Sequence, residues 1–258
     1  MTRLPLSLVV ITQDAATQLP NCLTSVPFAD EILVVDSGSR DATTTIAETH
    51  GARVVHQAWL GFGPQKRFAV QEAQHDWVLC LDADESLSPA LRQAIEHELS
   101  TPRFTAYRFA RRNRFLGRWL RHGEGYPDWQ LRLFHRNHAQ WRTDPIHEGV
   151  EAQGKVGTLT GDLLHESAQT LESYLAKQNR YTSLQAERLI AAGKRPGAAR
   201  IVLSPLLRFF KFYLLRLGFL DGTPGLVHIL IGCFNSFCKY AKAREGWIQQ
   251  PAPRVNNP

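Results

Sequence analysis

The chain lacks the features that mark several classes of protein. Its 258 residues include only four cysteines, and none of these form a Cys-x-x-Cys pair. Cys22 and Cys80 lie within apolar patterns, which argues against a disulfide framework and indicates buried thiols in a reducing compartment. No uninterrupted apolar stretch reaches the roughly 18 residues that a membrane-spanning helix needs. The apolar run near the amino end is too short for a signal peptide and is typical of a first strand.

Glycine and lysine are both absent from residues 12–20. A nucleotidyltransferase would be expected to carry a Gly-rich, basic loop after the first strand. This absence therefore argues against a nucleotidyltransferase. The formal net charge of +6 indicates an anionic partner such as nucleotide phosphate, acidic lipid or nucleic acid. Because the cations are spread along the chain and no nucleic-acid motif is present, we expect no nucleic-acid partner.

The first hundred residues alternate between strand and helix patterns. The sequence predicts strands at 6–12, 31–36, 53–56 and 77–82, and helices from about 19, between 39 and Gly51, at 64–74 and from Ser88 onward. Such alternation predicts an α/β fold with a mainly parallel, Rossmann-like sheet. Residues 105–111, 129–135, 139–143 and 156–164 predict further, more polar strands. We expect this second half to cover the ligand site of the first.

Two carboxylates follow the apolar strand at 77–82. Side chains two apart on a strand point the same way, so Asp82 and Asp84 would converge if the extended geometry persists. Two close carboxylates repel each other, and a hard cation such as Mg²⁺ or Mn²⁺ removes the conflict. The alternative is a turn in which one acid caps the next helix. In parallel sheets ligands bind at the carboxyl ends of the strands, where these residues would lie.

A second acidic strand end is Asp36, in the run Val-Val-Asp-Ser-Gly-Ser-Arg-Asp at 34–41. We expect the chain to leave the sheet here at a Gly-bearing turn, with a helix beginning near Ser39. The Asp36 carboxylate would accept hydrogen bonds from a base or ribose, and the free N–H groups of the helix start would favour phosphate. Asp36 and Asp41 are equally typical of ordinary turn acids.

Together these motifs resemble glycosyltransferase family 2, of the GT-A fold. Val-Val-Asp-Ser-Gly-Ser-x-Asp and Trp-Val-Leu-x-Leu-Asp-Ala-Asp-Glu are similar to its nucleotide-diphosphosugar core, and Pro-Gln-Lys-Arg-Phe-Ala at 64–69 is similar to its nucleotide-side helix. Segments at 125–134, 146–148, 164–167 and 218–222 resemble the subgroup of bacterial lipopolysaccharide core β-1,4-glucosyltransferases. The chain departs from the family at 12–15, where Thr-Gln-Asp-Ala replaces the commoner Thr-Tyr-Asn-Glu, and this affects the expected base and sugar preference.

The resemblance implies roles for individual residues. Asp84 would bind a metal that bridges the diphosphate, with Asp82 on the ribose or a metal-bound water and His165 as a further ligand or a diphosphate contact. A hydrogen-bonded structural histidine is the alternative for His165. The other positions that would contact a nucleotide sugar are Thr12, Asp36, Ser37, Lys66, Ala83 and Arg132.

Transfer of a sugar from a diphosphate to a hydroxyl requires a base for that hydroxyl. Asp128 is the first candidate, because Pro-Asp-Trp-Gln-Leu-Arg-Leu at 127–133 resembles the acidic Glu-Asp-Trp motif of the family. Glu148, beside His147, is the second candidate. A cap after Pro127 is the structural alternative for Asp128.

The carboxyl-terminal part has a different character. Residues 170–192 predict a helix, and residues 200–217 project as a basic amphipathic helix with Arg200, Arg208, Lys211 and Arg216 on one side. Such a helix lies in an anionic membrane interface or packs its apolar face on the catalytic domain. We therefore expect a glycosyltransferase domain at 1–168, divided into a nucleotide-sugar half (1–100) and an acceptor half (101–168). A helical extension (169–248) and a flexible tail (249–258) would follow.

These observations lead to one expected function. The chain would be an inverting, metal-dependent transferase that moves a hexose, most simply glucose, from a UDP-sugar to a lipopolysaccharide core or other lipid-linked saccharide. It would act in the cytoplasm, peripherally at the inner face of the bacterial inner membrane. A non-catalytic saccharide-binding relative is a further alternative, against which the intact Asp82, Asp84 and Asp128 argue. The sequence predicts no particular oligomeric state.

Overall fold

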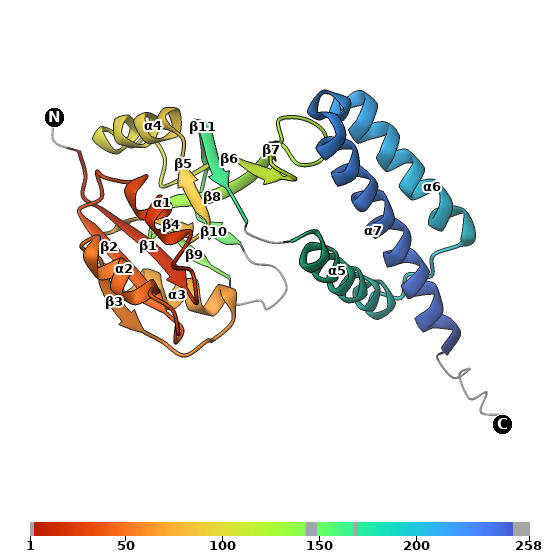
Figure 1. Ribbon diagram of the computed structural model, residues 1–258, viewed down its shortest axis with the longest axis horizontal. Helices are drawn as coiled ribbons and strands as arrows, with labels where there is room; N and C mark the ends of the chain where they lie inside the picture. Colours follow the sequence, from red (N-terminus) through yellow and green to blue (C-terminus); the bar gives the residue numbers. More distant parts are fainter. Residues whose placement is uncertain (1–2, 143–148, 168–169, 250–258) are drawn as a thin grey trace. The chain divides into compact units, whose positions relative to one another are not determined.

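The computed structural model describes residues 3–142, 149–167 and 170–249 (Figure 1). These residues form two compact units. Unit 1 comprises residues up to 114 together with 127–167, and unit 2 comprises 115–126 together with the residues from 168 onward. Residues 115–126, which we expected in the acceptor half, therefore group with the helices that follow the sheet.

Unit 1 is an α/β unit built on one large sheet. The strand order is β3-β2-β1-β4-β8-β6-β11-β5, in which the first four strands are parallel and β8 is antiparallel to both β4 and β6. The strands are β1 (Leu6–Thr12), β2 (Glu31–Asp36), β3 (Arg53–His56), β4 (Trp77–Asp82), β5 (Glu85–Leu87), β6 (Ala106–Phe115), β8 (Asp128–His135) and β11 (Gly157–His165). A separate two-stranded sheet pairs β9 (Ala139–Trp141) with β10 (Val150–Ala152).

Alternation along the parallel strands creates two apolar layers, one on each face of the sheet. Leu79 and Leu81 of β4 belong to the layer that α1 (Leu19–Thr24), α2 (Thr43–Thr49) and α4 (Pro89–Ser100) cover. Val78 and Cys80 point to the other face, which α3 (Phe62–Glu72) and β9 cover. Asp82 continues the second alternation. Its side chain therefore lies on the α3 face.

Helix α4 begins as its sequence predicts, since the Ser88 hydroxyl accepts a hydrogen bond of 3.3 Å from Leu91 N and Pro89 occupies the first turn. Helix α2 begins later than predicted. Ser39 does not cap it, because the Ser39 hydroxyl donates to Asp36 instead, and α2 begins at Thr43. The Thr43 backbone N–H donates 3.0 Å to Asp41 Oδ1.

Unit 2 consists of long helices and one inserted loop. Its helical elements are α5 (Leu171–Ala191), α6 (Ala198–Phe209), the π-helical turn η1 (Phe210–Leu215), the 3₁₀ turn η2 (Gly218–Asp221) and α7 (Gly222–Gln249). α7 packs against both α5 and α6. The inserted loop carries the short strand β7 (Arg118–Trp119). Buried Asp221 holds this loop by accepting hydrogen bonds from the backbone N–H groups of Arg121 (2.9 Å) and His122 (2.8 Å).

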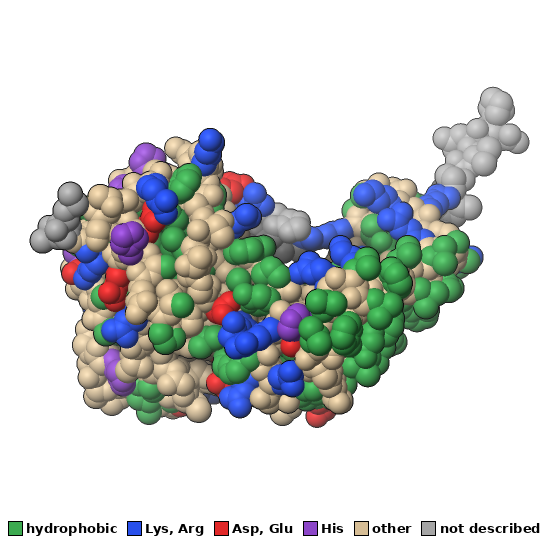
Figure 2. Space-filling model, turned by 90° about the horizontal axis from the view of Figure 1, so that it is seen from above, with side chains coloured by type: hydrophobic (Ala, Val, Ile, Leu, Met, Phe, Trp, Pro, Cys, Tyr) green, Lys and Arg blue, Asp and Glu red, His purple; other side chains and the backbone are tan. Residues whose placement is uncertain are grey.

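Apolar side chains gather on the surface of unit 2 (Figure 2). Of the 24 large apolar side chains that are exposed among the described residues, 13 lie between residues 202 and 237. Within the described part of the chain, no single helix has the length and hydropathy to cross a membrane. The two segments Ala198–Leu215 and Gly218–Gln249, bent by 74° at their junction, meet those criteria only as a pair.

Candidate active site

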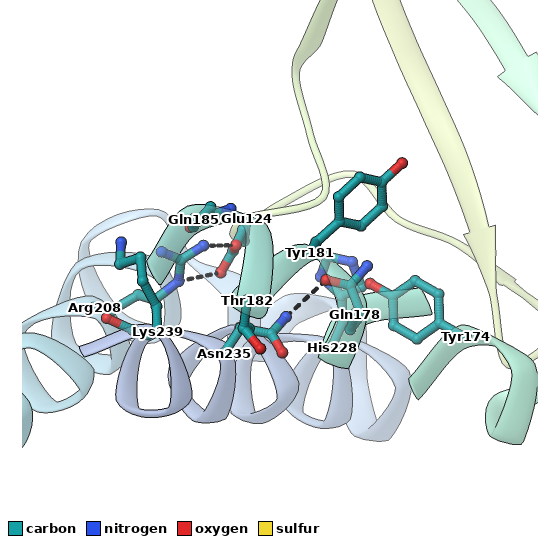
Figure 3. A pocket seen from close by; sticks show the side chains of 12 residues that line it. Glu124, Tyr174, Gln178, Tyr181, Thr182, Gln185, Arg208, His228, Asn235 and Lys239 are labelled. Atoms are coloured by element: carbon teal, nitrogen blue, oxygen red, sulfur yellow. Dashed lines mark hydrogen bonds and ion pairs between the residues drawn. The ribbon is translucent and has the colours of Figure 1, made fainter. Parts of the chain in front are cut away.

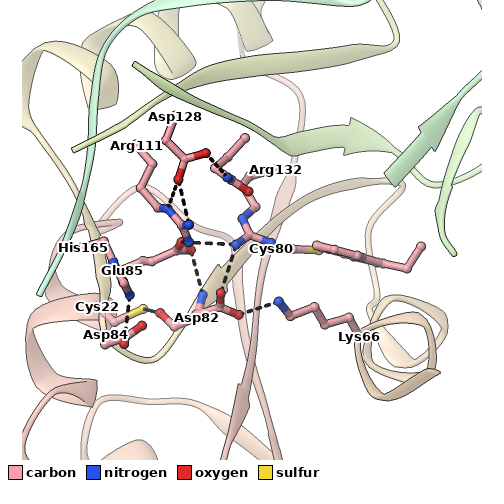
Figure 4. A network of polar contacts seen from close by, with 12 residues as sticks. Cys22, Lys66, Cys80, Asp82, Asp84, Glu85, Arg111, Asp128, Arg132 and His165 are labelled. Atoms are coloured by element: carbon pink, nitrogen blue, oxygen red, sulfur yellow. Dashed lines mark hydrogen bonds and ion pairs between the residues drawn. The ribbon is translucent and has the colours of Figure 1, made fainter. Parts of the chain in front are cut away.

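Asp82, the last residue of β4, lies between two buried cations (Figure 4). Its Oδ1 atom is 2.7 Å from Lys66 Nζ on α3, and its Oδ2 atom accepts a hydrogen bond of 2.9 Å from Arg132 Nη2 on β8. Both cations also lie over the Trp141 ring, at 4.8 and 5.3 Å from its centre. Burial raises the pKa of the Asp82 carboxyl, but Lys66 and Arg132 outweigh it and hold that pKa well below its ordinary value. Asp82 is therefore ionised.

Glu85 is the second carboxylate of this network, and its side chain is fully buried. Its Oε1 atom is 3.1 Å from Arg132 Nη2 and 3.2 Å from Arg111 Nη1, while its Oε2 atom accepts a hydrogen bond of 3.0 Å from the Asp82 backbone N–H. Burial lowers the pKa of the Arg132 guanidinium, but Glu85 and Asp82 raise it further than burial lowers it. Opposite charges thus alternate along the edge of the sheet, which makes their common burial tolerable.

Asp128, the first residue of β8, ends this series of charges. Arg111 Nε and Nη2 both approach its Oδ2 atom, at 2.9 and 2.7 Å, and Gln130 Nε2 donates 2.8 Å to its Oδ1 atom. The register pairs Arg111 of β6 with Asp128, so the sheet itself sets this contact. The carboxylate has a fixed orientation and is one-third exposed. A carboxylate held in this way can accept a proton from a hydroxyl placed at the edge.

Asp84 and His165 form a separate pair. Asp84 Oδ2 is 3.1 Å from His165 Nε2, and Asn113 Oδ1 is 2.8 Å from His165 Nδ1. The Asn113 amide thus faces Nδ1, which leaves Nε2 facing the Asp84 carboxylate. A histidine whose other nitrogen donates to a carbonyl is the usual arrangement of a metal ligand. This pair could supply two ligands of a divalent cation, and the others would come from water and substrate oxygens.

Asp82 and Asp84 do not converge on one volume, contrary to the prediction. The extended geometry ends at Asp82, and a turn follows before β5 begins at Glu85. Asp82 consequently faces Lys66 and Arg132, while Asp84 faces His165 (Figure 4). Among the described residues, no three His, Cys, Asp or Glu side chains lie close enough together to hold a metal ion. Of the three predicted metal ligands, Asp84 and His165 are in contact, whereas Asp82 is bonded to Lys66 and Arg132.

The Asp36 carboxylate organises its own turn. Its Oδ2 atom accepts backbone hydrogen bonds from Gly38 (2.8 Å) and Ser39 (2.9 Å), and its Oδ1 atom accepts from the hydroxyls of Thr12 (3.2 Å) and Ser39. These bonds hold the pKa of Asp36 below its ordinary value against the opposing effect of burial. A carboxylate offers about four acceptor positions, and the turn uses all of them. A ligand that contacts Asp36 would have to replace one of these bonds.

The remaining predicted residues lie at the same edge. Thr12, at the end of β1, pairs in register with Asp36 at the end of β2, and its backbone carbonyl accepts a hydrogen bond of 2.9 Å from Ser37 N. Ala83 packs against the core between the two acids. Glu148 and its neighbour His147 lie outside the described residues. The second candidate for the base therefore stays a prediction.

Sequence reasoning missed two kinds of residue. Glu85 and Arg111 bridge Asp82 to Asp128, and the only sequence signals were the acid directly after Asp-Ala-Asp and the unusual number of arginines in 105–114. Gln65 was also missed. It is fully buried on α3, and its Nε2 atom donates 3.1 Å to Ser37 Oγ and 3.0 Å to Gln57 O. It thereby fixes the Ser37 turn beside the site.

The fold has counterparts among solved structures. The crystal structure of S. aureus TarS 1–349 in complex with UDP-GlcNAc superposes with a TM-score of 0.50 at 14% sequence identity, over 95% of this chain and 92% of that one. At this identity the likeness concerns the fold alone. Unit 1 has the mainly parallel sheet of the GT-A glycosyltransferases, and helices follow it, as the sequence resemblance predicted.

Sequence similarity to other glycosyltransferases extends over nearly the whole chain. The lipopolysaccharide core biosynthesis glycosyltransferase LpsC of Rhizobium meliloti is 28% identical over 263 aligned residues, which cover 99% of this chain and 97% of LpsC. An uncharacterized glycosyltransferase of Rickettsia bellii is 34% identical, with 96% of this chain and 90% of that protein covered. The family described as Glycosyl transferase family 2 matches residues 7–153. The chain is an enzyme that belongs to glycosyltransferase family 2.

Proposed function

We propose that this chain transfers a hexose, most simply glucose, from a UDP-sugar to a saccharide of a lipid-linked acceptor, with inversion at the sugar carbon. The observation that carries the proposal is the arrangement at one edge of the sheet. The Asp84–His165 pair lies there together with the charged series that runs from Lys66 to Asp128. The likeness to LpsC, a lipopolysaccharide core biosynthesis enzyme, supports a lipopolysaccharide core as the acceptor.

Asp84 and His165 would hold the divalent ion, Mg²⁺ or Mn²⁺. When bound, this ion would offset negative charge on the diphosphate leaving group. The residues of the chain supply the rest. Asp128 takes the proton of the acceptor hydroxyl. The hydroxyl oxygen then bonds to the sugar carbon, while the bond from that carbon to the diphosphate oxygen breaks. Glu148 is the alternative base.

Lys66 and Arg132 would stabilise the negative charge that develops on the leaving diphosphate. They are held at this edge by Asp82, and Trp141 covers them on one side. Fixed cations in a site of low dielectric act without reorganisation at the moment of reaction. Thr12, Asp36, Ser37 and Ala83 would form the part of the site nearest the nucleoside.

We also propose that unit 2 contacts an anionic membrane surface, at the cytoplasmic face of the inner membrane. The exposed apolar side chains between residues 202 and 237 support this, since soluble surfaces rarely gather so many. Lys211 and Arg216 are exposed beside them. All four cations of the predicted basic side have contacts within unit 2. Arg216 Nη2 donates 3.0 Å to Tyr126 O, and Lys211 Nζ lies 5.2 Å from the Phe212 ring centre. Arg208 pairs with Glu124, and Arg200 lies 5.3 Å from the Tyr240 ring centre. Apolar contact therefore contributes more than charge.

Two measurements test the catalytic proposal. Thermal unfolding of the full chain with a panel of nucleotide sugars, each with Mn²⁺ or Mg²⁺, should give a higher Tm for the true donor only when the metal is present. Asp84→Ala should abolish this metal-dependent increase and lower the rate of transfer by at least about 100-fold. Asp76→Ala is the matched control, since Asp76 is an exposed aspartate at the opposite end of β4. Transfer at the wild-type rate by Asp84→Ala would refute the assignment.

A further inference from the structure

Part of the interior of unit 2 is polar, although apolar side chains such as Ile229 and Ala243 are also buried there and many others are exposed on its surface. α5 and α7 face each other with residues spaced at i, i+4, i+7, i+8 and i+11, the spacing of one helix face. On these faces an apolar stripe would be expected. The side chains there are instead mostly hydroxyl and amide groups, and they line a cavity of about 140 Å³ together with Glu124 and Arg208 (Figure 3). The lining residues from the two helices are Tyr174, Gln178, Tyr181, Thr182 and Gln185 of α5, and His228, Gly232, Asn235, Ser236 and Lys239 of α7.

Several of these side chains are fixed by contacts that face the cavity. Gln178 Oε1 accepts a hydrogen bond of 2.8 Å from Asn235 Nδ2. Arg208 grips both carboxylate oxygens of Glu124. A Cβ atom on Gly232 would overlap the Glu124 carboxylate, so the glycine leaves the room that this carboxylate occupies. The cavity is therefore shaped by specific residue choices and not by loose packing.

The cavity has an enclosed floor and an accessible rim. Thr182 and Ser236 are 2% and 4% exposed, whereas Tyr181 is 41% exposed. A single buried water needs roughly 10–15 Å³ on the same measure, so this volume exceeds the need of a structural water by about tenfold. His228 also lines the cavity, and its buried Nδ1 atom has no hydrogen-bond partner among the described residues. The space fits a polar ligand of several atoms that can still supply hydrogen bonds.

The charged residues that line the cavity indicate which class of ligand it can bind. The two cations of the lining are both engaged, Arg208 by the Glu124 carboxylate and Lys239 over the Tyr240 ring at 4.6 Å from its centre. An anion would have to compete with Glu124. The buried hydroxyls of Thr182 and Ser236 bond within the protein, to Asn179 O at 2.7 Å and to Ser204 Oγ at 2.8 Å. The amides and tyrosine hydroxyls of the lining can each donate and accept, as a ring bearing several hydroxyl groups requires. Tyrosine rings add amphipathic surface suited to the faces of such a ring.

We propose that this cavity binds one neutral sugar residue of the saccharide acceptor, at a site of unit 2 that is separate from the donor edge of unit 1. The identity of the saccharide rests on the proposed function. The polar cavity and the apolar surface of unit 2 then have a common explanation. An acceptor that joins a saccharide to a lipid presents both kinds of surface, and unit 2 matches each with the corresponding kind of side chain.

The test measures binding without catalysis. Core oligosaccharide, freed of its lipid by mild acid, is titrated into the full chain and followed by calorimetry, with no nucleotide sugar present. The double variant Gln178→Leu/Asn235→Leu removes two amides that bond to each other, so neither partner is left unsatisfied and Tm should change little. We expect the Kd of the oligosaccharide to rise about tenfold or more. Gln249→Leu, an exposed position of α7, is the matched control and should leave the Kd unchanged.

The outcomes separate this inference from the proposed function. Equal oligosaccharide affinity in the double variant and the wild type would overturn the cavity site, as would an absence of binding to the wild type. Competition by inorganic phosphate at equal affinity would also overturn it, since the cavity would then be an anion site. Donor-dependent stabilisation with Mn²⁺ or Mg²⁺ reports only on unit 1. Its failure would refute the catalytic proposal whatever the oligosaccharide does.

Discussion

The two units place charge and apolar surface in opposite positions. Unit 1 has apolar layers on both faces of its sheet, and it concentrates buried charge at one edge, where Asp82, Arg132 and Glu85 lie in contact. Unit 2 has amides and hydroxyls between its helices and exposes leucine and phenylalanine. Unit 1 follows the rule for a protein surrounded by water, with one exception that costs stability. Unit 2 departs from the rule both at its cavity and on its exposed face, although Leu120, Ile229 and Ala243 are buried in it.

The buried charge of unit 1 and the exposed apolar face of unit 2 have different meanings. Buried charged groups are concentrated at functional sites, because their shifted pKa values serve binding and catalysis there. An exposed apolar face instead marks a surface that meets something other than water. The comparison therefore predicts that polar changes at the edge of unit 1 alter chemistry, whereas changes on the surface of unit 2 alter location.

The largest effect is expected at Asp128. Asp128→Asn keeps the shape of the side chain and its contact with Gln130 but removes the proton acceptor. Loss of a general base should lower kcat by about 10²- to 10⁴-fold, with little change in the KM of the donor. Steady-state transfer kinetics measure both constants. Asp76→Asn is the control, because Asp76 is also an arginine-paired aspartate, with Arg136 at 3.1 Å, and lies at the other end of β4.

A contrary result would identify the base differently. If Asp128→Asn transferred sugar at the wild-type rate while Glu148→Gln did not, Glu148 would be the base and Asp128 would only position Arg111. The charged series of unit 1 would then be structural at this end. The charged edge of unit 1 would then not supply the catalytic base.

A smaller effect, on stability alone, is expected at Glu98. Arg103 lowers its pKa, burial opposes this, and Tyr107 adds to the lowering, so the pKa falls from 4.5 to about 2. A carboxyl whose pKa is depressed by folding stabilises the protein above its unfolded pKa and loses that contribution as the pH falls towards its folded pKa. The free energy of unfolding should thus drop by about 2 kcal/mol between pH 5 and pH 2 through this group.

Glu98→Gln should flatten that part of the pH dependence and leave transfer at neutral pH unchanged. Urea unfolding at a series of pH values measures it. Glu96→Gln, at a partly exposed residue of the same helix with an i,i+4 arginine partner, should keep the wild-type slope. A fall in transfer activity in Glu98→Gln would show that buried charge in unit 1 supports chemistry even away from the strand edge.

Much of unit 1 could be predicted from the sequence. Strands β1 to β4 coincide with their predicted bounds, because each is a short apolar run that ends at a polar residue or a turn. β5 was missed, since Glu85–Leu87 is only three residues long and its pairing with β11 is set by contacts far apart in the chain. For the same reason Arg111 could not be assigned to Asp128. Register between distant strands decides that contact, and sequence periodicity does not contain it.

Unit 2 was predictable in its helices and not in its interior. The amphipathic projection identified the apolar side of 200–217, and Leu206 and Phe210 are indeed exposed. It could not reveal that Arg208 turns inward to Glu124, because Glu124 lies in a loop inserted between two strands of the other unit. Without that contact, the sequence could not decide whether the helix at 200–217 lies in a membrane interface or packs on the catalytic domain.

The smallest effect on the protein itself is expected on the exposed face of α6. Leu206 and Leu207 are 60% and 67% exposed, so replacing both by serine removes little that is buried in the protein, and Tm should stay within about 2 °C of the wild type. If the face enters a bilayer, each leucine loses part of the 1.5–3 kcal/mol of apolar burial, and partitioning should weaken by roughly tenfold per residue. Co-sedimentation with phosphatidylglycerol vesicles measures this. Leu60→Ser, at an exposed leucine of unit 1, should not alter it. A lower Tm with unchanged vesicle binding would mean that protein covers the face, and unit 2 would then follow the same rule as unit 1.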